Sequence, residues 1–210
     1  MVTYIILGIT VLASFYAWNN PEVYHRWMLN PYDVKRKNQY YRFITSGLIH
    51  GDHMHLFFNM LTLYFFRGVE DGFMGLYGYW GIPLYLLLYI GGMIISDIPS
   101  FLKNQKNPAF NSLGASGAIS AVVFSGILFN PLMELNIFFI LPITAFIYAI
   151  LYLIYSYYQG KQLGDGINHD AHFYGALFGL AFTIIVYPPI VPFFFKQLGH
   201  WQMFKSILGR

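Results

Sequence analysis

Six long apolar stretches, separated by the segments that carry most of the charge, constrain this chain more than any other feature of its sequence. They cover about 2–18, 54–69, 80–97, 113–130, 136–158 and 170–190. Each is close to the ~20 residues that a helix needs to cross a bilayer. Only 10% of the residues are charged, against roughly 25% in an ordinary soluble domain. The pattern predicts one all-α polytopic membrane domain over residues 1–210, with six transmembrane helices.

The remaining composition excludes several classes of function. The formal net charge of +3 is small and the basic residues are scattered, so the sequence does not support a nucleic-acid surface. Because the chain has no cysteine, disulfides, thiolate catalysis and cysteine-ligated metals are excluded. Any hydrolytic chemistry must therefore use serine, histidine, carboxylates or a metal.

The composition of the segments outside these stretches also predicts their structure. The long connection 19–50 mixes prolines, aromatic residues and a basic run at 35–37, which suits a loop lying in the lipid interface. Over 193–210, apolar residues recur at helical spacing among lysines, which predicts an amphipathic tail helix. The first stretch is interpreted as a retained helix, because Met1–Tyr4 carries no charged side chain and no convincing cleavage site follows. Glycines within 68–81 are interpreted as turn and packing positions.

Polar residues at the starts of alternate apolar stretches carry most of the functional information. His55 and Asn59 open the second stretch, Ser116 opens the fourth and His172 opens the sixth. Such groups are costly at bilayer depth, so each needs a partner or a task. Since consecutive spans alternate in direction, these starts all lie at one face of the membrane, on the order of 10 Å deep. We expect one shared pocket near that face.

Ser116 and His172 are suited to act as a nucleophile and its base. An imidazole that takes its proton activates a serine hydroxyl, and the small residues around both positions allow their helices to approach closely. We therefore expect the Ser116 hydroxyl oxygen within about 3.5 Å of a His172 ring nitrogen. His55 and Asn59 share a helix face and, with the Ser116 backbone N–H, would bind an oxyanion. Asp170 points off the face of His172, so we expect a dyad without a carboxylate.

Three sequence motifs resemble the signatures of the rhomboid family. They are listed here in chain order: His55-Leu56-Phe57-Phe58-Asn59, Gly114-Ala115-Ser116-Gly117, and His172-Phe173-Tyr174-Gly175 with Gly179. The resemblance covers about residues 40–185 and implies a six-helix fold. It further implies an intramembrane serine endopeptidase with Ser116 and His172 as its catalytic dyad, and His55 and Asn59 as oxyanion donors. The expected substrates are single-pass or polytopic membrane proteins, cleaved in their transmembrane segments without cofactor or metal.

The same resemblance implies a location and an orientation. We expect an integral protein of a bacterial plasma membrane, with its active site near the extracytoplasmic face. In that orientation the inner segments carry four lysines and arginines and the outer ones eight, which opposes the positive-inside rule. Five of the eight lie in the first loop, where an interfacial fold would hold them against lipid headgroups.

One position departs from the family pattern. Many rhomboids carry an aromatic residue four positions after the nucleophile, where it packs on the catalytic histidine, but this chain has Ser120 there. Another group must then orient His172. The aromatic residues Phe58, Phe146, Tyr148 and Tyr152 are candidates for a gate to the site.

Parts of the sequence are also compatible with three functions other than a protease. Histidines at 50, 53, 55, 169 and 172 suggest a metal enzyme, but the His-Glu-x-x-His spacing is missing. The three at 50, 53 and 55 do not share a helix face, and few carboxylates are available. A transporter or channel is disfavoured because the polar residues are confined to one leaflet and inverted repeats are missing. A noncatalytic rhomboid relative remains an alternative, which the presence of both dyad residues disfavours.

Overall fold

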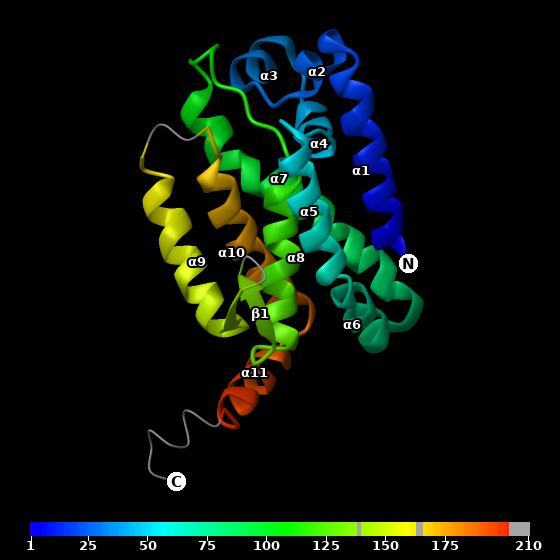
Figure 1. Ribbon diagram of the computed structural model, residues 1–210, viewed down its shortest axis with the longest axis vertical. Helices are drawn as coiled ribbons and strands as arrows, with labels where there is room; N and C mark the ends of the chain where they lie inside the picture. The colour runs from blue at the N-terminus through cyan, green and yellow to red at the C-terminus, as the bar shows by residue number, and fades with distance from the viewer. Residues whose placement is uncertain (138–139, 163–165, 202–210) are drawn as a thin grey trace.

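The computed structural model describes residues 1–137, 140–162 and 166–201, and its regular structure is predominantly helical (Figure 1). The longer helices are α1 (Val2–Trp18), α5 (His53–Phe65), α6 (Gly68–Tyr77), α7 (Gly81–Asn104), α8 (Ser116–Phe129), α9 (Ala145–Gln159), α10 (His169–Val186) and α11 (Ile190–Leu198). Figure 1 shows α8 in the middle of the bundle, with α9 at one edge and α1 at the other.

Helix α8 forms the core of the bundle. Every residue from Gly117 to Leu128 is buried. Small residues permit this position, because a Cβ atom at Gly175 of α10 would collide with the Gly117 carbonyl. A Cβ atom at Gly179, one turn further along α10, would collide with the Ala121 carbonyl in the same way. The two backbones are therefore in direct contact, as small residues allow in membrane helix pairs.

The predicted interfacial first loop is folded into short helices. These are α2 (Pro21–Trp27), α3 (Pro31–Lys37), α4 (Arg42–Thr45) and the 3-10 turn η1 (Ser46–Leu48). Proline occupies the first position of α2 and of α3, where its missing N–H costs no helical hydrogen bond. The Asn30 side chain caps α3 by accepting from the Asp33 N–H at 2.9 Å.

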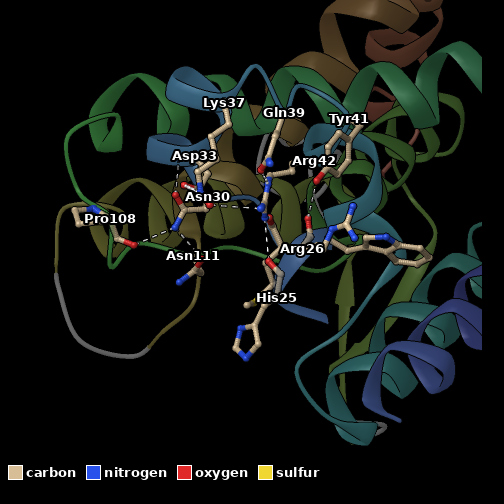
Figure 2. A network of polar contacts seen from close by, with 12 residues as sticks. His25, Arg26, Asn30, Asp33, Lys37, Gln39, Tyr41, Arg42, Pro108 and Asn111 are labelled. Carbon is tan, nitrogen blue, oxygen red and sulfur yellow. Dashed lines mark hydrogen bonds and ion pairs between the residues drawn. The ribbon is translucent and has the colours of Figure 1, made fainter. Parts of the chain in front are cut away.

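A buried arginine holds these short helices together (Figure 2). The Arg42 guanidinium donates to the carbonyls of His25 at 3.0 Å and Met28 at 2.6 Å, and to the Gln39 side chain at 2.7 Å. It also lies 3.5 Å from the Asp33 carboxylate. The amide of Asn30 donates to carbonyls within 108–110, which ties this loop to the segment that precedes α8.

The structure corrects the predicted fifth helix, which was placed at 136–158. Helix α9 begins only at Ala145, and before it β1 (Glu134–Ile137) pairs antiparallel with β2 (Leu141–Thr144). Pro142 disfavours a helix at this point, because a proline inside a helix removes a hydrogen bond and collides with the preceding turn. Its register partner in the hairpin is Asn136.

Other predicted boundaries also change. The glycines within 68–81 belong largely to a helix, α6, which ends where Gly78 adopts a left-handed φ of 58°. A second 3-10 turn, η2 (Gly78–Trp80), leads into α7, which continues to Asn104, beyond the predicted end at 97. Of the predicted tail helix 193–210, the first part lies in α11, and 202–210 lies outside the described residues.

Within the described residues, length and apolar composition identify two helical segments able to cross a membrane, His53–Asn104 and His169–Val186. The first comprises α5, α6 and α7. Val2–Trp18 and Ser116–Phe129 are apolar helices that fall short of the same length. The six predicted spans therefore remain a prediction.

Candidate active site

Ser116 and His172 meet at the ends of two adjacent helices. Ser116 is the first residue of α8, and His172 lies in the first turn of α10. The Ser116 Oγ and the His172 Nε2 are 2.8 Å apart, within the 3.5 Å expected from the sequence. With Nε2 unprotonated, the serine hydroxyl donates to it, which is the arrangement that proton transfer requires.

The backbone before Ser116 is held by three contacts from the first loop. Leu29 and Ser112 exchange backbone hydrogen bonds at 2.9 Å in both directions. The Gly114 N–H donates to the Ser46 carbonyl at 2.9 Å. Gly114 has a φ of 117°, a conformation that an L side chain rarely adopts. The first loop thus fixes where α8 begins, and with it the position of Ser116.

His50 supplies the third contact and was missed as a site residue. The Ala115 N–H donates to the His50 Nε2 at 3.3 Å. Because a backbone N–H only donates, Nδ1 carries the ring proton and donates to the Ser14 Oγ at 3.1 Å. The imidazole is fully buried, and burial lowers the pKa of His50 to about 3, so the neutral ring persists. The sequence suggested only a possible metal ligand here, since no spacing rule connects residues 50 and 115.

His55 and Asn59 lie beside the dyad on α5. Both line the same cavity of about 730 Å³ as Ser116 and His172. The His55 ring lies so close to Gly114 that a Cβ atom there would approach its Cε1 to 2.7 Å. The Asn59 amide donates one hydrogen to the His55 carbonyl at 2.9 Å. The sequence-predicted residues from three helices are therefore brought together.

The start of α10 is fixed by Asn168, which the sequence analysis did not identify. Its Oδ1 accepts from the Ala171 N–H at 3.1 Å and from the Ser100 hydroxyl at 2.8 Å. Its amide donates to the Ser112 hydroxyl at 3.0 Å. Asn168 thereby joins the start of α10 to α7 and to the segment before α8.

The carboxylate nearest to His172 in sequence has a different partner. Asp170 Oδ2 lies 2.6 Å from the Lys103 ammonium on α7. This contact agrees with the expectation that Asp170 points away from His172. Among the residues that the structure describes, no three His, Asp or Glu side chains come together as a metal site would require. The five histidines suggested by the metal hypothesis are not arranged as ligands of one ion within that part of the chain.

The structure thus places a serine hydroxyl and a histidine ring nitrogen within hydrogen-bonding distance inside a helical bundle. The rhomboid domain family model matches residues 37–189, so this chain belongs to the rhomboid family, whose members are membrane-embedded. The chain is also similar to RHOMBOID-like protein 12, mitochondrial, of Arabidopsis thaliana, at 25% identity over 82% of this chain. It spans 55% of that protein's length. The expected bacterial location stays a prediction, because this relative is mitochondrial.

Proposed function

We propose that this chain is an intramembrane serine endopeptidase that cleaves transmembrane segments of other membrane proteins. The observation that supports the proposal best is the 2.8 Å contact between the Ser116 Oγ and the His172 Nε2, in a cavity shared with His55 and Asn59. We further propose six membrane spans, which membership of a membrane-embedded family supports. The cavity would lie near the extracytoplasmic face, as the resemblance to rhomboids implies.

The proposed reaction is acyl transfer in two steps. The Ser116 Oγ attacks the scissile carbonyl carbon while the His172 Nε2 takes the hydroxyl proton. His55, Asn59 and the Ser116 N–H donate to the oxyanion, and the positive end of the α8 dipole adds to this stabilisation. The C–N bond then breaks and His172 gives its proton to the leaving amine.

Water completes the cycle. His172 takes a proton from a water molecule, whose oxygen attacks the acyl carbon bound to Ser116. The ester bond breaks and the proton returns to the serine oxygen. These steps use only groups of this protein, the substrate and water, so the proposal includes no cofactor and no metal.

Fluorophosphonate labelling of the full chain in detergent tests this function. We expect the parent to label covalently and Ser116→Ala to lose all labelling, because only a base-activated hydroxyl reacts. Ser125→Ala is the matched control, since this buried α8 serine bonds to Thr183 instead and should label like the parent. An unlabelled parent would favour a noncatalytic rhomboid relative. Labelling that persists in Ser116→Ala, or cleavage that chelators stop, would favour a metal enzyme.

A further inference from the structure

The small side chain of Ser120 leaves one face of the catalytic imidazole open to a residue from another helix. Ser120 is buried one turn after Ser116 on α8. Its hydroxyl lies 2.7 Å from the phenol oxygen of Tyr152 on α9. The Tyr152 ring is stacked on the His172 ring, with centroids 6.3 Å apart and planes inclined by 25°. Tyr152 thus contacts both α8 and the base.

Tyr152 is itself held in place from several sides. Phe124 of α8 and Tyr148 of α9 pack against its ring at centroid distances of 5.4 Å and 5.5 Å. Such distances are within the roughly 4.5–7 Å over which aromatic pairs attract. Together with the Ser120 hydrogen bond, these contacts leave the phenol little freedom to rotate. A ring fixed in this way is a stable wall for the imidazole.

A general base works only when its ring nitrogen points at the proton that it takes. Rotation of the His172 ring about its χ2 torsion, which has broad minima, would move Nε2 away from the Ser116 Oγ. A flat aromatic neighbour opposes that rotation, because turning the imidazole would give up the near-parallel stacking of the two rings. Asp170 does not serve this purpose, since it pairs with Lys103.

We propose that Tyr152 is a positioning residue that holds His172 in register with Ser116, and that Ser120 anchors it through the phenol hydroxyl. This inference rests on the proposed protease function. It assigns to α9 the aromatic contact that many rhomboids supply from the nucleophile helix. Packing of α9 against α8 therefore contributes to the alignment of the base.

Steady-state cleavage of a transmembrane substrate, measured with thermal unfolding, tests this role. Tyr152→Leu keeps most of the side-chain volume but lacks a planar ring. We expect kcat to fall on the order of 10- to 100-fold with KM changed by less than about 3-fold, because misalignment of a catalytic group acts on the chemical step. Tyr152→Phe keeps the ring and should retain kcat within about 5-fold. Tyr158→Leu, an exposed position on the same helix, is the control and should match the parent.

Exchange of Ser120 and Tyr152 tests for a rescue of activity that a merely structural role of Tyr152 would not produce. In Ser120→Tyr combined with Tyr152→Ser, the new phenol would occupy the space that the native one leaves beside His172. We expect this double variant to recover at least about 5-fold in kcat over Tyr152→Ser alone. Parental kcat in Tyr152→Leu, a rise in KM instead, or loss of activity only in proportion to lost folding would overturn the positioning role alone. A parent that neither labels nor cleaves would refute the protease function, and the positioning role with it.

Discussion

Substitution of single residues on α5 would distinguish an acyl-transfer site from a simple hydrogen bond between Ser116 and His172. His55 and Asn59 line the same cavity as Ser116 and His172. One amide hydrogen of Asn59 bonds to the His55 carbonyl, which fixes the amide plane and leaves the second hydrogen for a ligand. This geometry suits a donor that acts when the carbonyl oxygen becomes anionic.

We therefore predict that His55→Ala and Asn59→Ala each lower turnover more than substrate binding. Loss of one oxyanion donor costs ~10²-fold or more in rate, although three donors sharing the oxygen soften each single effect. The double variant should approach the Ser116→Ala background. Cleavage rate and melting temperature, measured on the same samples, check this expectation. If both single variants cleave at the parental rate, the two residues are structural.

Among the helices, the pair α8 and α10 decides whether the dyad forms. Their backbones touch at Gly117 and Gly175, one residue beyond Ser116 and three beyond His172. Dispersion contacts and close packing, rather than apolar burial, stabilise such pairs in a membrane. A side chain at this contact would push the helices apart next to the Ser116 Oγ and the His172 Nε2, which lie 2.8 Å apart.

Gly175→Leu is predicted to lose most of the activity, because its side chain would separate α10 from α8 and lengthen the Ser116–His172 contact. Gly175→Ala should lie between it and the parent, since a single Cβ atom already meets the Gly117 carbonyl. Gly75→Leu on α6 is the matched control, as a Cβ atom there has no neighbour within 4 Å. Labelling rate with a fluorophosphonate measures the effect. Full labelling of Gly175→Leu would show that the helices do not meet there.

Different structural elements lie at the two ends of the helical bundle. The first-loop helices and the connection from α7 to α8 lie at one end of the bundle, and α6, the hairpin and α11 lie toward the other (Figure 1). Helix α7 joins these ends with 24 residues, about 36 Å at ~1.5 Å per residue, which exceeds the ~30 Å of a hydrocarbon core. The site belongs to the first end, since that end holds the starts of α5, α8 and α10.

Cysteine labelling in intact cells tests the proposed orientation, in which the end of the bundle that holds the site faces outward. Each introduced cysteine reports on one position, because the chain has no native cysteine. We predict that Lys106→Cys, in the exposed connection after α7, reacts with a membrane-impermeant maleimide from outside. Tyr79→Cys, at the 88% exposed position before α7, should react only after the membrane is permeabilised. The reverse pattern would mean that the Lys/Arg distribution sets the topology. Equal reaction of both from outside would mean that α7 does not cross the membrane.

Much of the site was predictable from the sequence, because it depends on the order of the apolar stretches along the chain and on their alternating direction. His55, Asn59, Ser116 and His172 each stand near the start of a helix that the apolar pattern indicates, and alternation of spans puts those starts at one end. The motifs around them predicted the rhomboid family, which the family model confirms. Local periodicity did not predict the paired strands 134–137 and 141–144, since a short apolar run fits either a helix or a strand.

Contacts between residues distant in the chain were decided only by the tertiary structure. His50 reaches the Ala115 N–H across 65 residues, and Tyr152 reaches Ser120 across 32. Both contacts depend on how each helix is rotated about its axis and how deeply it packs, and hydrophobic periodicity does not define either within a uniformly apolar helix such as α8. The sequence by itself thus identified the four polar residues that share the cavity, whereas packing decided which neighbours hold them in place.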